Sequence, residues 1–271
     1  MKYVFISLAF LAVTILAGYV ITRFLTAKRE YSRSRQALLI VAVSGLLMAV
    51  GTFGYFQIYY HADPSAGDYL VSHDGVRVSK VASGYFFDGP GTDKAIIFYP
   101  GGKVAEEAYA PLLFELAEQG ADCFLVRMPL RMAVLGVSSA DKIMAGYDYP
   151  QWYLMGHSLG GSAAALYAAK NPEKLAGLIL LASYSTRKLP DDLRLLSIYG
   201  SEDGCLELKV YEEKKSLWPN DSQELVIAGG NHCQFGSYGF QKGDGQALIS
   251  PQQQRSETVS AIASWLPEGD R

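Results

Sequence analysis

Cysteine and histidine are scarce in this chain of 271 residues, which contains three cysteines and four histidines. The cysteines, Cys123, Cys205 and Cys233, form no CxxC pair and show no His/Cys ligand spacing. Because a structural or catalytic metal needs such clustered ligands, the sequence predicts no metal site. Cys123 lies in an apolar run and is expected in a buried strand.

Acidic residues are almost absent from the first sixty positions. Glu30 is the one acid there, against six lysines and arginines, which gives this segment a net charge of +5. Since the whole chain has a net charge of −3, the remainder carries −8. A globular part with this acidic balance lacks the basic surface that nucleic acids require, so nucleic acid is excluded as a partner.

The same sixty residues contain two long runs without Asp, Glu, Lys or Arg, at residues 3–22 and 36–60. With a rise of about 1.5 Å per residue, each run is long enough to cross a bilayer as a helix. The second run ends in tyrosine and phenylalanine rings, which are typical of a membrane interface. A core helix is disfavoured because both runs are apolar all round. We therefore predict a membrane anchor over residues 1–60, with transmembrane helices at about 3–22 and 36–60.

Basic residues are concentrated between the two runs, from Arg23 to Arg35. Positively charged loops stay on the cytoplasmic side, so the simplest topology is a transmembrane hairpin with both termini outside. A cleaved signal peptide is the alternative for the first run, with Lys2 as its charged start and a poor cleavage site at residues 16–18. The prediction is a protein of the cell membrane whose C-terminal domain is extracytoplasmic.

Residues 61–67 are expected to be a linker, because Asp-Pro and Gly mark irregular backbone, and a domain follows over residues 68–271. In this domain, apolar runs alternate with segments of helical periodicity, which predicts βαβ units and a mostly parallel α/β sheet flanked by helices. Sites in such sheets form at the carboxyl ends of the strands. Strands are expected at 76–84, 85–88, 94–99, 121–128, 151–156, 175–183, 193–199 and 224–228, and helices at 105–119, 159–170, 207–216 and 251–266.

Ser158 follows one of these strands, in the sequence Gly-His-Ser-Leu-Gly-Gly over residues 156–161. This is G-x-S-x-G between an apolar strand and a helix of small residues, which is the context of a nucleophile elbow. The glycines allow a turn too tight for a Cβ, and the start of the helix favours a developing negative charge. We expect Ser158 to be a nucleophile.

His232 is the only histidine that follows Ser158 in the chain, and it lies just beyond an expected strand. The fold that carries this elbow orders its triad as serine, acid and histidine, so His232 is the expected base. The acid should follow the preceding strand, which points to Asp203, with Glu202 one residue earlier as the fallback. Its carboxylate would hold the imidazole in the working tautomer.

An oxyanion hole needs two backbone N–H donors, and no particular side chain. Leu159, directly after the nucleophile, should supply one. The second should come from the loop after the strand at 94–99, where we favour Gly102 over Lys103. A triad with such a hole requires neither a metal nor an organic cofactor.

Four segments taken together resemble a known family. They are residues 99–104, 156–161, 200–204 and 230–236. They are similar to the compact α/β-hydrolases of bacteria, a group called alpha/beta hydrolase family five and related to the dienelactone hydrolases, and the similarity runs from about residue 68 to residue 266. Its most group-specific part follows the histidine and includes Gly243-Asp244-Gly245. The resemblance implies the α/β-hydrolase fold and places the family's triad on Ser158, Asp203 and His232.

Two features depart from the family pattern. Dienelactone hydrolases use a cysteine nucleophile where this chain has Ser158, so their substrate is not implied. Cys205 and Cys233 stand where small apolar residues are expected, each within two residues of a triad position. Chance placement in loops is the favoured interpretation, and a disulfide between the two loops is the alternative outside the cytoplasm.

The sequence thus predicts a membrane-anchored serine hydrolase that cleaves an ester-type acyl bond through an acyl-enzyme intermediate. The short stretch between Ser183 and Leu193 leaves no room for a helical cap, which favours small or surface-exposed esters. The position beside the membrane keeps lipid-derived esters among the candidate substrates. An acyltransferase with the same triad and a non-catalytic, membrane-tethered binding protein on the same fold are the alternatives.

Overall fold

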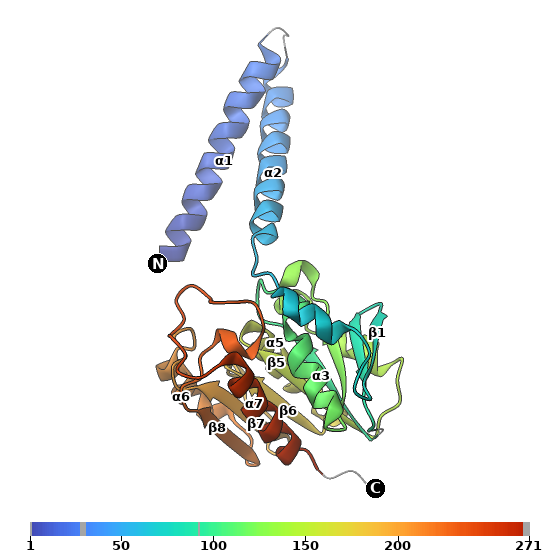
Figure 1. Cartoon of the computed structure of the whole chain (residues 1–271). Helices are drawn as coiled ribbons and strands as arrows, with labels where there is room; N and C mark the ends of the chain where they lie inside the picture. The colour runs from blue at the N-terminus through green and yellow to red at the C-terminus, as the bar shows by residue number, and fades with distance from the viewer. Residues whose placement is uncertain (1, 28–30, 92, 268–271) are drawn as a thin grey trace. The chain divides into compact units, whose positions relative to one another are not determined.

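The structure, a computed structural model, describes residues 2–27, 31–91 and 93–267 (Figure 1). The chain divides into two units, Met1–Ile58 and Tyr59–Arg271. The first is helical, and the second contains a sheet covered by helices on both faces.

The first unit consists of α1 (Lys2–Thr26) and α2 (Arg33–Gln57), which pack against each other. Their contact is made by small and hydroxyl-bearing residues: a Cβ added at Gly18 would lie 2.0 Å from Ser44 Oγ. Thr14, Thr22 and Thr26 are also buried, and together with Gly18 they recur every four residues on one face of α1. Leucine, isoleucine and valine side chains point outward instead. Such a seam is typical of helix pairs in lipid.

By length and composition α2 can cross a membrane, with 25 residues and a mean hydropathy of 2.2 over its most apolar stretch. Among the described residues it is the one helix that reaches this limit, and Leu11–Thr26 is a shorter apolar helix. The side chains of residues 3–10, the first part of the span expected at 3–22, lie outside the described ones. A membrane anchor and a signal sequence both contain a helix like α2.

Within the described residues, the second unit is built on an eight-stranded sheet in the order β1-β2-β4-β3-β5-β6-β7-β8. β1 pairs antiparallel with β2, and β2 with β4, whereas all other pairs are parallel. The strands are β1 (Arg77–Val81), β2 (Gly84–Asp88), β3 (Lys94–Tyr99), β4 (Asp122–Val126), β5 (Gln151–His157), β6 (Gly177–Leu181), β7 (Arg194–Gly200) and β8 (Ser222–Ile227). This is the mostly parallel sheet that the sequence predicts.

The sheet separates two hydrophobic cores. Successive side chains of a strand point to opposite faces, so β3 sends Ile96 and Phe98 into one core and Ala95 and Ile97 into the other. Residues 95–99 of β3 are all hydrophobic or aromatic, because helices cover the sheet on both faces. Helices α3 (Ala110–Glu118) and α7 (Pro251–Trp265) cover the first face, and α4 (Ser139–Met144) and α5 (Leu159–Ala168) the second; α6 (Leu208–Lys214) lies between β7 and β8 in the chain.

The stretch between β6 and β7 contains no helix, and residues 182–193 are all described. The absence of a large cap is therefore confirmed. The helix expected at 105–119 is divided into a 3₁₀ turn, Glu106–Tyr109, followed by α3. Pro111 lies in the first turn of α3, where its missing N–H costs nothing, so the regular helix begins there.

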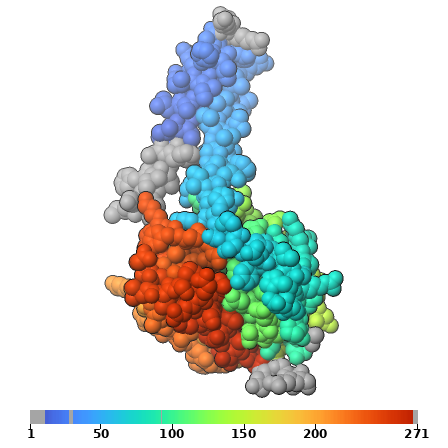
Figure 2. Space-filling model, viewed as in Figure 1, coloured from blue at the N-terminus to red at the C-terminus, as the bar shows by residue number. Residues whose placement is uncertain are grey.

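The second unit begins earlier than the domain start expected at residue 68. Tyr60 bridges the loop after β3: its N–H donates to Lys103 O and its carbonyl accepts from Ala105 N, each at 2.8 Å. The N–H of Asp63 donates to Ser237 O at 2.7 Å. Residues 61–67, expected to be a linker, thus belong to the second unit, and part of them forms the 3₁₀ helix Pro64–Leu70. Figure 2 shows this segment in cyan beside the C-terminal residues in orange and red.

Candidate active site

Ser158 lies at the turn between β5 and α5 with φ 52° and ψ −123°, a conformation that residues other than glycine rarely adopt. The flanking glycines permit this turn. A Cβ at Gly156 would lie 2.5 Å from the carbonyl carbon of Gly160, and one at Gly160 would lie 2.0 Å from Tyr99 O. The backbone around Ser158 is therefore packed too closely for any side chain at these two positions. Strain of this kind is typical of functional sites.

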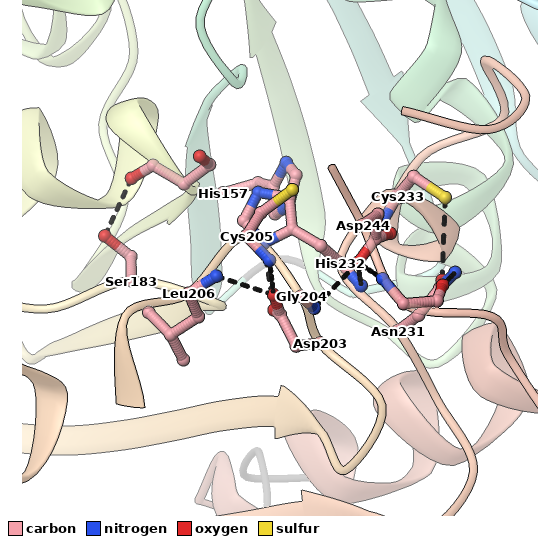
Figure 3. A network of polar contacts seen from close by, with 12 residues as sticks. His157, Ser183, Asp203, Gly204, Cys205, Leu206, Asn231, His232, Cys233 and Asp244 are labelled. Atoms are coloured by element: carbon pink, nitrogen blue, oxygen red, sulfur yellow. Dashed lines mark hydrogen bonds and ion pairs between the residues drawn. The ribbon is translucent and has the colours of Figure 1, made fainter. Parts of the chain in front are cut away.

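Asp203 and His232 follow the neighbouring strands β7 and β8, and their side chains meet. Asp203 Oδ2 lies 2.9 Å from His232 Nδ1, and both side chains are almost completely buried (Figure 3). The second oxygen, Oδ1, accepts from the N–H groups of Cys205 at 2.8 Å and Leu206 at 2.7 Å. Because a carboxylate only accepts, Nδ1 carries the hydrogen, which leaves Nε2 to act as the acceptor.

Ser158 and His232 line one cavity of about 240 Å³. His232 Nε2 is buried and has no hydrogen-bond partner among the described residues. Hydrogen bonds between nucleophile and base are often long in free enzymes and tighten with substrate. The remaining lining residues are Leu159, Ser162, Ala182, Ser183, Tyr184, Cys205, Leu206 and Glu207.

The two residues expected to supply the oxyanion donors lie next to each other. A Cβ at Gly102 would come within 2.8 Å of Leu159 Cδ2, so the backbone of Gly102 is in contact with that residue. The alternative donor, Lys103, gives its N–H to Arg131 O at 2.9 Å. The geometry therefore favours Gly102 over Lys103, as the sequence does.

Two residues that contact His232 or its loop were not identified as such from the sequence, namely His157 and Gln254. The ring of His157 packs at a tilt against that of His232, and its Nδ1 lies 2.8 Å from Tyr109 OH. Gln254 on α7 is fully buried; its Oε1 accepts from Asn231 N at 2.9 Å and its Nε2 donates to Asn231 O at 2.8 Å. His157 thus contacts the ring of His232, the expected base, and Gln254 binds the loop that carries it. A buried glutamine in an amphipathic helix is a weak sequence signal, and its contact with residue 231 is not local.

The thiols of Cys123, Cys205 and Cys233 are free, so the disulfide considered between the last two is not formed. Cys205 Sγ contacts Gln241 Nε2 at 3.3 Å. Burial raises the pKa of Cys205 to about 11, and that of Cys233 to about 11 as well. Both therefore remain protonated near neutral pH, where a thiol is a poor nucleophile.

The sequence profile of the alpha/beta hydrolase family matches residues 95–256. The chain belongs to the alpha/beta hydrolase family. The resemblance seen in the sequence motifs is thus confirmed. No curated protein sequence matches the chain.

Solved structures are similar to this alpha/beta hydrolase in fold. A dienelactone hydrolase from Anabaena variabilis ATCC 29413 is 14% identical, with a TM-score of 0.53 over 71% of this chain and 97% of that one. MGS-MChE2, an alpha/beta hydrolase from the metagenome of sediments of the Mar Chica lagoon in Morocco, is 16% identical, with a TM-score of 0.53 over 70% and 97%. Est1E from Butyrivibrio proteoclasticus is 13% identical, with a TM-score of 0.50 over 71% and 97%. At these identities the likeness shows the fold alone.

Proposed function

We propose that this alpha/beta hydrolase is a serine hydrolase that cleaves an ester-type acyl bond, with Ser158 as nucleophile, His232 as base and Asp203 as acid. The observation that carries the proposal is the buried Asp203–His232 pair, whose imidazole lines the same cavity as the strained Ser158. Family membership supports hydrolysis in general. The geometry of these three residues supports the specific chemistry.

The reaction has two steps. His232 Nε2 accepts the hydroxyl proton of Ser158 while Oγ attacks the acyl carbon, and the N–H groups of Gly102 and Leu159 stabilise the negative oxygen. The carbon–oxygen bond to the leaving alcohol breaks, and that alcohol takes the proton from His232. Water then attacks the acyl-enzyme, gives a proton to His232 and releases the acid, and Ser158 regains its hydrogen.

The shape of the site limits the substrate. The cavity is about 240 Å³ and no helix covers it between β6 and β7. This space suits the acyl part of a small ester, and a larger alcohol part can remain outside. We therefore assign small-molecule or lipid-derived esters as the substrate class.

We further propose that α1 and α2 anchor the protein in the cell membrane, with the hydrolase domain on the extracytoplasmic side. The apolar length of α2 and the seam of small residues against α1 support a helix pair in lipid. The basic residues between the helices favour a cytoplasmic connection. Extraction of membranes with alkaline carbonate tests the anchoring: a chain that keeps α2 stays in the pellet, whereas a chain from which both helices have been cleaved appears in the supernatant.

Labelling with a fluorophosphonate probe tests the catalytic proposal. The probe phosphonylates an activated serine, so the full-length wild-type chain should label and Ser158→Ala should not. Ser162→Ala is a matched control, because this second serine lines the same cavity. A folded wild-type chain that does not label would contradict the proposal and favour a binding protein on a hydrolase fold. Products formed with an added alcohol acceptor distinguish an acyltransferase from a hydrolase.

A further inference from the structure

Asp244 lies in the irregular segment between the catalytic histidine and α7, and its carboxylate binds four backbone N–H groups. Oδ1 accepts from Gly204 at 3.0 Å, from His232 at 3.2 Å and from Gly245 at 2.8 Å. Oδ2 accepts from Cys233 at 2.8 Å. Figure 3 shows the carboxylate between the loops that carry these donors.

Three of the four donors lie in the loops that carry Asp203 and His232. Gly204 directly follows Asp203 in the loop after β7, and His232 and Cys233 lie in the loop after β8. The side chains of Asp203 and His232 join the two loops, and Asp244 joins them again through backbone groups of both. The loops also meet directly, where Glu202 N donates to Gly230 O at 2.8 Å. Hydrogen bonds to an ionised acceptor are about twice as strong as neutral ones.

Close packing of glycines brings Asp244 to this position. A Cβ at Gly204 would lie 2.6 Å from Gly245 N, and a Cβ at Gly245 would lie 1.8 Å from Glu202 O. Gly243 has φ +96°, in the left-handed region that favours glycine. The segment 243–245 therefore lies with its backbone directly on the acid loop.

The charge state of Asp244 agrees with this role. Burial acts to raise its pKa, but the N–H groups of Gly204, Cys233 and His232 outweigh burial, and the net result is a pKa below the usual value. The carboxylate is ionised at neutral pH. It can therefore accept at both oxygens, which an amide cannot do.

We propose that Asp244 is a positioning residue, which holds the acid loop and the base loop in the register that the Asp203–His232 pair requires. The inference rests on the proposed function, because it assigns a role relative to that pair. The physical reason is that three N–H donors from these two loops converge on one carboxylate, which also accepts from its neighbour Gly245. A shift of either loop separates Asp203 from His232, or moves Nε2 away from Ser158, and misplacement of about 1 Å can lower a rate by about a hundredfold.

Asp244→Asn in the full-length chain, purified in detergent, tests this inference. The side-chain NH₂ group must face at least one backbone N–H, so one or more of the four bonds is lost. The matched control is Asp141→Asn, since Asp141 also accepts from two groups, Tyr167 OH and Lys174 Nζ, but lies on α4 outside the site. Both variants are compared with wild type for kcat and KM on a p-nitrophenyl ester, and for the rate constant and final amplitude of fluorophosphonate labelling.

We expect kcat and the labelling rate constant of Asp244→Asn to fall by about 10- to 100-fold, with KM and amplitude unchanged. Asp141→Asn should keep the wild-type rate constant. The final labelling amplitude measures the fraction of molecules that are folded. If Asp244→Asn loses amplitude but labels at the wild-type rate constant, its defect is structural only, and this outcome overturns the inference. Unchanged kcat in Asp244→Asn overturns it too. A wild-type chain that does not label overturns the proposed function itself, and this inference with it.

Discussion

The rings of His157 and His232 pack against each other with their centroids 4.6 Å apart and their planes tilted by 49°. Burial, together with repulsion from His232, holds the pKa of His157 well below its usual range. His157 therefore stays neutral, so that His232 can take up a proton without a second cation beside it. The side chain before Ser158 thus packs against His232, the proposed base.

Tyr109 connects His157 to the loop of the oxyanion hole. Its hydroxyl accepts from Gly101 N at 3.1 Å and forms a second hydrogen bond, of 2.8 Å, with His157 Nδ1. Tyr109→Phe leaves both buried groups without a partner, at a cost of about 1–3 kcal/mol for each group. We expect a lower free energy of unfolding and a lower kcat, measured by urea denaturation and ester hydrolysis.

Tyr99→Phe is the control for that prediction. Tyr99 is also a buried tyrosine with two hydrogen bonds, one to Val137 O and one from Ala140 N. It should lose stability to a similar degree and keep its kcat once folded. If both variants lose the same fraction of kcat, the link from Tyr109 to the oxyanion loop has no catalytic role.

The protonated thiol of Cys205 gives a second prediction. Because its pKa is raised to about 11, the thiolate fraction near pH 7 is very small and should grow about tenfold per pH unit. Alkylation of Cys205 by iodoacetamide, followed by mass spectrometry between pH 7 and 9, should therefore be slow and rise with this slope. Cys205→Ser should label with fluorophosphonate as wild type does. Fast alkylation at pH 7 would show that a thiolate lies beside the site.

Local signals explain why so much of this molecule was predictable from the sequence. The strand predicted at 94–99 has the same bounds in the structure. A strand buried on both faces is a continuous apolar run, which can be recognised from these residues alone. The triad positions followed from strand ends and chain order. Whether the three residues act as predicted depends on the experiments above.

What the sequence could not predict depends on contacts between distant segments. The apolar run at 36–60 has no internal boundary, yet α2 ends at Gln57 and Tyr60 pairs with the loop after β3. The role inferred for Asp244 depends on a left-handed turn at Gly243 and on two loops that are 40 and 12 residues away in the chain. Neither the Tyr60 pairing nor the Asp244 hydrogen bonds produce a periodic pattern in the sequence from which they could be predicted.

Asp203→Asn tests the orientation of the base. The amide can place its NH₂ group toward His232 Nδ1, which favours the tautomer with the hydrogen on Nε2 and removes the acceptor for the Ser158 proton. We expect kcat to fall by about 10⁴-fold with little change in folding. Glu202→Gln is the control, since Glu202 is the fallback acid and bonds to Ser201 Oγ instead. If Glu202→Gln loses its activity and Asp203→Asn keeps it, then Glu202, and not Asp203, is the acid of the triad.

Gly160, two residues after Ser158, gives the sharpest test of the tight turn between β5 and α5. A Cβ at Gly160 would lie 2.0 Å from Tyr99 O and 2.4 Å from Pro100 O, both backbone atoms that cannot rotate away. Gly160→Ala should therefore lower the free energy of unfolding by about 1–3 kcal/mol or more, and move Leu159 N–H away from Gly102. Gly67→Ala is the matched control, because nothing lies within 4 Å of its added Cβ. Urea denaturation and fluorophosphonate labelling of both variants give the answer: a Gly160→Ala chain as stable and as reactive as Gly67→Ala would mean that the tight approach of the elbow to the loop after β3 is not required for the activity of Ser158.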